Sequence, residues 1–173
     1  LLGRARIEGS VGVNDGDVAI ESFASRAYEP PVSRELGDER TTTARVVASL
    51  TLPGAGQLRA GATTADVRYD ETLDAQLPTS RPTRYRQRLG SLGFEAELPV
   101  LSRVALSAGV VRDAAETPEA GGREPLGALS RWGWRVGATT AVRDAVRLHA
   151  SASTRARFPA LRELYSGALN RFV

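Results

Sequence analysis

The chain has 173 residues, enough for one domain of ordinary size, and carries a formal net charge of +3 at pH 7. Cysteine is absent, which excludes disulfides, Cys-ligated zinc and thiol catalysis. No apolar run approaches the roughly 18 residues that a membrane-spanning helix needs, so a helical membrane protein is excluded within this segment. The chain contains no lysine, and its arginines reflect either a biased genomic base composition or an anionic partner such as lipid headgroups.

Apolar and polar residues alternate along most of the chain, and a period of two predicts β-strands. In chain order, the alternating stretches cover residues 4–13, 18–28, 44–52, 57–69, 84–98, 103–111, 131–142 and 147–157. They give about eight strands, several of them longer than the globular average of about 5–6 residues.

The joins between these stretches fall into two kinds. Short, turn-like joins are expected at 14–17, 53–56, 99–102 and 142–145, and longer polar joins at 29–40, 70–83 and 113–130. The two kinds alternate strictly, whereas Greek-key connections in soluble sandwiches mix the lengths. We therefore predict an all-β fold: a segment of an antiparallel up-and-down transmembrane β-barrel, with short turns at one end and long loops at the other.

The composition of the two strand faces agrees with this fold. One face is rich in Ala, Val and Leu, while the opposite face carries many arginines, which a wide and wet lumen tolerates. Tyr69, Tyr85, Trp132 and Trp134 are at strand ends that border long loops, so we expect them to be interfacial aromatics. The alternative is that these aromatics cap a soluble barrel.

No catalytic constellation stands out from the sequence. The single histidine, His149, has no second His or Cys near it to make a zinc site, and we expect neither an enzyme, a metal nor a cofactor. Arg84 and Arg86 lie on one strand face, opposite Tyr85, where they would draw an anionic ligand or hold lipopolysaccharide phosphates. The alternative is that these arginines are simply solvated at the base of a long loop and bind no ligand. Nucleic acid is not an expected partner, because no recognised binding fold accompanies the charge.

The stretch "RARFPALRELYSG", residues 155–167, resembles the mid-barrel signature of TonB-dependent outer-membrane receptors, a segment similar to Gly-Phe-Arg-x-Pro-x-x-x-Glu-Leu-Tyr. The matching positions are Arg157, Pro159, Glu163, Leu164 and Tyr165. The Gly and Phe positions of the signature are occupied by Arg155 and Ala156. Apolar residues over 158–172 also have nearly helical spacing, which predicts a short helix leaning on the barrel rim.

The resemblance implies an outer-membrane location in a Gram-negative cell, with outer-membrane lipid and a small-molecule ligand, anionic or a metal chelate, as partners. It implies active uptake of a scarce ligand, such as an iron–siderophore complex, a cobalamin or a glycan, energised by the TonB complex through a plug domain. Such barrels have about 22 strands, so residues 1–173 are expected to be an internal segment of one barrel domain, without the plug or the barrel ends. Arg84, Arg86 and Arg157 are the candidates for ligand contact.

Two other functions remain open from the sequence. One is a complete small outer-membrane barrel that acts as an anchor or adhesin, since the smallest such barrels have about eight strands. The length and the expected strand number of this chain fit it. A soluble all-β binding domain or enzyme would instead stay in solution without detergent.

Overall fold

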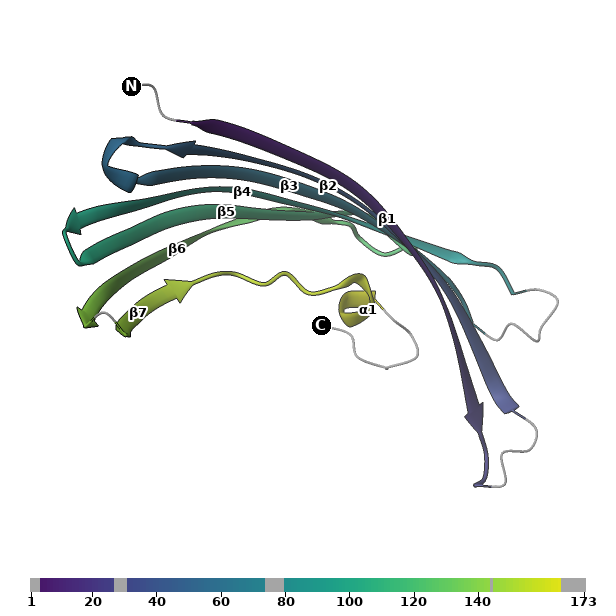
Figure 1. Cartoon of the computed structure of the whole chain (residues 1–173). Helices are drawn as coiled ribbons and strands as arrows, with labels where there is room; N and C mark the ends of the chain where they lie inside the picture. Colours follow the sequence, from purple (N-terminus) through teal and green to yellow (C-terminus); the bar gives the residue numbers. More distant parts are fainter. Residues whose placement is uncertain (1–3, 27–30, 74–79, 144, 166–173) are drawn as a thin grey trace.

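The computed structural model describes residues 4–26, 31–73, 80–143 and 145–165. These residues form one antiparallel sheet of seven strands, in which each strand pairs with the next along the chain (Figure 1). The strands are β1 (Ala5–Phe23), β2 (Pro31–Thr51), β3 (Gln57–Thr72), β4 (Thr83–Leu101), β5 (Val104–Ala120), β6 (Leu126–Arg143) and β7 (Val146–Thr154), with a 3-10 turn η1 (Pro53–Ala55) and a helix α1 (Leu161–Tyr165).

The sheet curls into a half-barrel, with β1 and β7 as its two edges and the helix α1 on its concave side, which we call the hollow (Figure 1). Within the described ranges β1 pairs only with β2 and β7 only with β6, so both edges are open. The predicted all-β, up-and-down antiparallel architecture is confirmed. Across the described part of the chain, no helix combines the length and the hydropathy needed to span a bilayer.

The predicted turn at 14–17 is wrong. The segment lies inside β1, which pairs without interruption with β2 from Asn14 opposite Thr41 to Asp17 opposite Asp38. Asp15 also makes an ion pair with Arg40 at 3.6 Å. Continuous pairing with a 21-residue neighbour therefore overrides the local turn preference of Asn, Asp and Gly. The predicted loops at 29–40 and 113–130 are likewise shorter, because β2 begins at Pro31 and β5 continues to Ala120.

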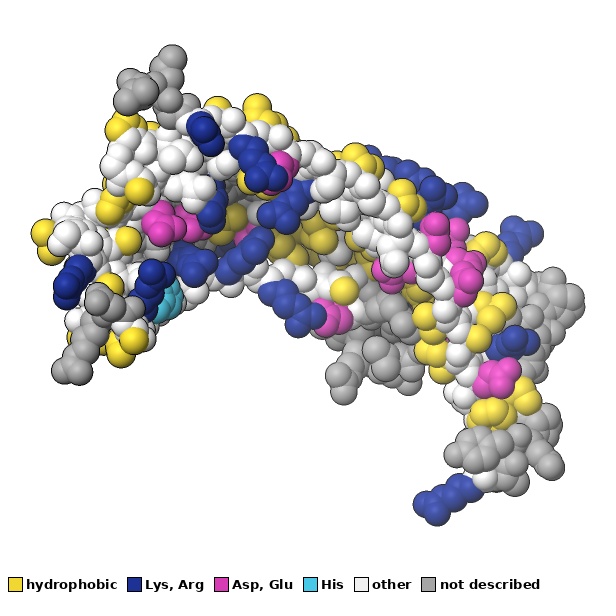
Figure 2. Space-filling model, viewed as in Figure 1, with side chains coloured by type: hydrophobic (Ala, Val, Ile, Leu, Met, Phe, Trp, Pro, Cys, Tyr) yellow, Lys and Arg dark blue, Asp and Glu magenta, His cyan; other side chains and the backbone are white. Residues whose placement is uncertain are grey.

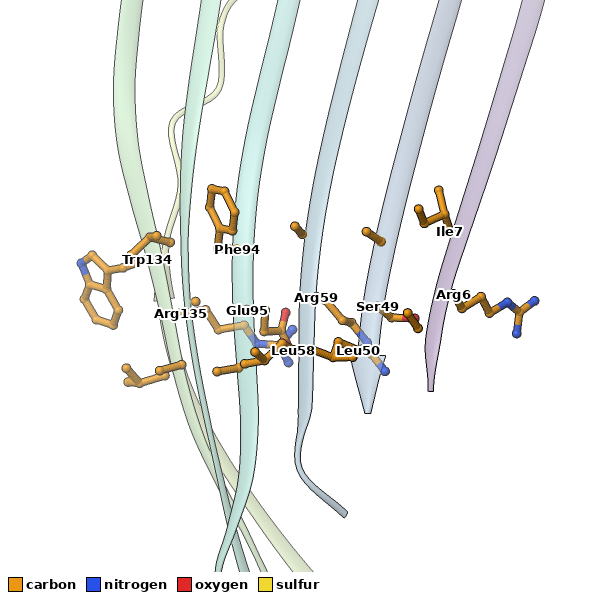
Figure 3. Close-up of a pocket in the computed structure, with 18 residues that line it drawn as sticks. Arg6, Ile7, Ser49, Leu50, Leu58, Arg59, Phe94, Glu95, Trp134 and Arg135 are labelled. Atoms are coloured by element: carbon orange, nitrogen blue, oxygen red, sulfur yellow. The ribbon is translucent and has the colours of Figure 1, made fainter. Parts of the chain in front are cut away.

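The convex face of the half-barrel carries an apolar band. Strand register aligns its side chains in cross-strand rows, one of which is Ile7, Ala48, Ala60, Phe94, Val110 and Trp134. Figure 3 shows Ile7, Phe94 and Trp134 of this row across the sheet, with Leu50 and Leu58 in the next row of the same face. The large side chains of these rows are exposed, up to 75 % for Ile7, so the described residues leave the band uncovered.

Beyond the band, toward the long-loop end, the convex face becomes charged. This charged belt consists of Asp15, Arg40, Asp66, Arg68, Arg86, Arg88, Glu116 and Glu119. Its side chains largely neutralise one another, as in the pairs of Arg86 with Asp66 and of Arg88 with Glu116, the second at 2.9 Å. Along the strands, the convex face is thus divided into an apolar zone and, nearer the long-loop end, an ion-paired zone.

The hollow has the opposite character. Arginine and carboxylate side chains gather on its wall near the short-turn end (Figure 2). Toward the long-loop end it holds the buried hydrophobic cluster of the described residues: Tyr69, Tyr85, Ala120, Leu161 and Tyr165. The core of this chain therefore lies between the sheet and the segment that follows β7.

Candidate functional site

The segment that carries the receptor-like signature lies inside the hollow. After Thr154 the chain leaves the sheet, crosses the concave wall and forms α1 beneath the middle strands (Figure 1). Of the helix predicted over 158–172, the described residues form Leu161–Tyr165, and the part of the prediction beyond residue 165 lies outside the described residues. The helix rests on the inner wall at β4 rather than on the rim.

An arginine–aspartate pair fixes the start of this segment. The Arg155 guanidinium donates two hydrogen bonds to the Asp113 carboxylate, at 3.0 and 2.9 Å, and a longer one of 3.4 Å to the Ser91 hydroxyl. Asp113 is buried on β5, and a two-pronged arginine contact is the strong form of such a pair. Arg155 occupies the glycine position of the signature, so this attachment belongs to this chain rather than to the pattern it resembles.

Three of the matching signature residues hold the segment's internal geometry. Arg157 donates to the Glu163 carboxylate, which also accepts from the Ala160 amide at 2.9 Å. The Pro159 carbonyl accepts a hydrogen bond of 2.9 Å from the Gln87 side chain on β4. The signature thus serves as a folded connector, tied to itself and to the wall.

The two contacts to Glu163 change its acidity. The Ala160 amide first, and then the Arg157 guanidinium, favour the charged carboxylate and hold the pKa of Glu163 below its ordinary value. Because the folded pKa is lowered, the stabilisation is complete above the ordinary value of about 4.3 and is lost as the pH falls through the folded value.

We therefore expect the turn at residues 160–165 to lose order progressively as the pH falls below about 4.3. Hydrogen–deuterium exchange of amides 160–165, corrected for the intrinsic pH dependence of exchange, measures this directly. The Glu163→Gln variant is the control, because its side chain does not titrate in this range. An equal pH dependence in the variant would assign the effect to another group.

Tyrosines form the contact between the segment and the sheet. The Tyr85 ring is stacked between Tyr69, at a centroid distance of 6.1 Å, and Tyr165, at 5.7 Å. The hydroxyls of Tyr69 and Tyr85 donate to the buried carboxylates of Glu35 and Glu71, both at 3.3 Å. Stacked and buried aromatic rings contribute beyond their buried area, so this stack is the main apolar contact between the segment and the sheet.

Glycines make room for the two wall tyrosines. A Cβ atom on Gly37 would overlap the Tyr69 ring and hydroxyl, and one on Gly121 would lie 2.5 Å from the Tyr85 ring. Gly121 also has a φ of +63°, which side-chain-bearing residues rarely adopt. The buried Tyr165 hydroxyl has no hydrogen-bond partner among the described residues, so packing rather than hydrogen bonding holds that ring.

The expected interfacial position is wrong for Tyr69 and Tyr85. They are only 2 % and 5 % exposed and face the hollow, because the apolar phase of β3 and β4 changes face toward the long-loop end. Trp132 and Trp134 do lie on the convex face, and Trp132 is 69 % exposed beside Arg112. Their role as interfacial aromatics stays a prediction.

The three arginines proposed for ligand contact do not share a site. Arg84 and Arg86 alternate with Tyr85 on β4 and therefore lie on the convex face, away from the hollow. Arg86 is bound to Asp66, with one hydrogen bond of 3.0 Å. Arg157 is exposed and paired with Glu163. A ligand inside the hollow would be out of reach of Arg84 and Arg86.

A different group of arginines faces the hollow, and sequence reasoning did not single it out. Arg6, Ser49, Arg59, Glu95, Gly109 and Arg135 are aligned across six strands. In Figure 3 the side chains of Arg59 and Arg135 lie on either side of Glu95. Alternation had placed several of these residues on polar faces, but only the register brings them into one row. Comparison with protein families, with curated proteins and with solved structures found no match to this chain.

Proposed function

We propose that the chain is part of the wall of an outer-membrane transport barrel in a Gram-negative cell. In this proposal the barrel is a receptor of the TonB-dependent kind, which takes up a scarce ligand such as an iron–siderophore complex, a cobalamin or a glycan. The energy comes from the TonB complex through a plug that fills the barrel. The chain contributes barrel wall, lumen lining and the connector of residues 155–165.

The observation that carries the proposal is the inverted distribution of polarity. In a soluble half-barrel the concave side would be packed and the convex side solvated, yet here, toward the short-turn end, the convex face carries the exposed apolar band and the hollow carries arginines. On β6 the outward positions from Trp132 to Val142 measure about 34 Å along the strand. At a strand tilt of about 40° this corresponds to about 26 Å, close to the apolar height of outer-membrane barrels.

The curvature favours a large barrel over a small one. Seven strands curl through only about half a barrel and leave β1 and β7 far from pairing (Figure 1). An eight-stranded barrel would nearly close with the same number. Unpaired strand edges are not stable in hydrocarbon, so further strands must complete the wall. This supports the transport barrel over the anchor or adhesin.

The signature segment supports the receptor assignment. Arg157, Pro159, Glu163 and Tyr165 make the contacts that fold the chain into the hollow and hold it there. A folded segment inside the lumen obstructs part of the passage and offers a surface to a plug or ligand.

The test combines location, size and energy coupling. An antiserum against residues 1–173 should detect a band in the outer-membrane fraction, several times heavier than the 18.4 kDa of this chain. An immobilised TonB carboxyl-terminal domain should retain that band from detergent extracts. A membrane band near 18 kDa would favour the small barrel, and a soluble band would refute both membrane functions.

A further inference from the structure

A concavity in the hollow is bounded by arginines from four strands or their ends. Arg45 of β2, Arg59 of β3, Arg135 of β6 and Arg155, just after β7, line a space of about 670 Å³. We call this space the arginine bay. Figure 2 shows dark blue side chains gathered inside the arch.

The bay has an excess of positive charge. Glu95 is the acidic residue in its lining, and the nearby Asp113 is already bound to Arg155. Within the described ranges, Arg45 and Arg135 form no ion pair. By contrast, the convex-face arginines Arg40 and Arg88 each have a carboxylate partner. Uncompensated like charges repel one another, so an anion in the bay would be stabilised.

Two of the glycines on the floor of the bay, Gly61 and Gly93, stand where a side chain would fit. A Cβ on Gly61 would come no closer than 3.7 Å to its neighbours and one on Gly93 no closer than 3.6 Å, both ordinary contacts. Neither glycine has a positive φ. Glycine inside a strand weakens the strand, and it often marks a place where a ligand approaches the backbone.

We infer that the arginine bay binds a small solute that carries two or more carboxylate or phosphate groups. The volume lies within the range of about 300–1,000 Å³ that small-molecule sites occupy. The guanidinium groups of Arg45 and Arg135 would bind the anionic groups by paired hydrogen bonds, and the bare floor would admit the body of the solute. The inference rests on the proposed function, since it gives the charge class of the ligand that the barrel would carry.

The test measures binding to the detergent-purified protein that carries residues 1–173. The probes are propane-1,2,3-tricarboxylate, its uncharged triethyl ester and pyrophosphate, in calorimetry at low salt. We expect the tricarboxylate or pyrophosphate to bind and the ester not to bind, with affinity falling as salt rises. The double variant Arg45→Gln/Arg135→Gln should bind at least about tenfold more weakly, because charge-assisted hydrogen bonds are lost.

Two further variants separate the bay from general charge and from folding. Arg40→Gln/Arg88→Gln removes the same charge from the convex face and should leave binding unchanged. Gly93→Val fills the floor with a residue that strands favour, so the sheet should remain as stable while binding falls. The relative affinity of the two charged probes assigns carboxylate or phosphate as the recognised group.

Several outcomes would overturn the inference. One is equal binding by the Arg45→Gln/Arg135→Gln variant, and another is binding of the uncharged ester. A third is binding of a poly-glutamate peptide with no binding of either small anion, which would assign the bay to an acidic protein segment. An outer-membrane, TonB-retained protein that binds none of the charged probes would refute the bay and leave the transport proposal standing. Binding of the charged probes by a protein that is not in the outer membrane would refute the transport proposal and leave the bay standing.

Discussion

Replacing Tyr85 with alanine should detach residues 158–165 from the barrel wall and lower the free energy of unfolding by about 3–5 kcal/mol, the usual cost of removing a buried aromatic ring. The ring is 5 % exposed and is stacked on both sides, against Tyr69 on the sheet and Tyr165 on α1. Its removal therefore leaves a cavity and also breaks the main contact of the segment. Urea titration of the detergent-folded protein measures the first effect.

Trypsin cleavage after Arg157 measures the second effect, because a detached segment exposes this bond to the protease. The control is Tyr85→Phe, which keeps the stacked ring and removes only the hydrogen bond to Glu71. Its expected cost is about 1 kcal/mol, with cleavage close to that of the unmodified protein. Unchanged protection at Arg157 in Tyr85→Ala would show that the Arg155–Asp113 pair and the Gln87–Pro159 bond hold the segment without the stack.

The strands were predictable from sequence because side-chain alternation is a local property. The short joins observed after β2, β4 and β6 begin within a few residues of those expected at 53–56, 99–102 and 142–145. The turn expected at 14–17 was not predictable as a strand, since only pairing with β2 overrides its composition. The parts of the strands that extend beyond the apolar band are solvated on their outer face. They therefore lack the hydrophobic periodicity by which a strand is predicted from sequence.

The site was less predictable, because it depends on register and on which face each strand turns inward. Asp113 and Arg155 are 42 positions apart, and no local pattern links them. Apolar residues precede Tyr69 on both faces of β3, so the sequence pattern does not show which face the ring occupies. The prediction of a lipid interface therefore depended on its aromatic character alone. The order of residues in 157–165 did identify a special segment, and the structure adds that this segment lies inside the hollow.

An arginine at Val110 should prevent assembly into the membrane, whereas an arginine at Val111 should not. The two valines are neighbours on β5, and their side chains lie on opposite faces: Val110 is on the convex apolar band beside Phe94 and Trp134, and Val111 is in the hollow between Gly93 and Gly133. An arginine on the lipid face of a barrel costs about 2–4 kcal/mol near the bilayer midplane. A solvated lumen tolerates the same side chain.

The measurement is the fraction of each variant that reaches a heat-modifiable, urea-resistant form in lipid vesicles. Because both variants replace valine by arginine on one strand, side-chain entropy and strand propensity cancel between them, and what differs is the face and, at Val111, the neighbouring arginines of the bay, which add to the cost of Val111→Arg. A large loss for Val110→Arg with a small loss for Val111→Arg would place lipid against the convex face. Equal losses would mean that both faces are covered by protein or by water, and the exposed apolar band would then require a protein partner in place of the bilayer.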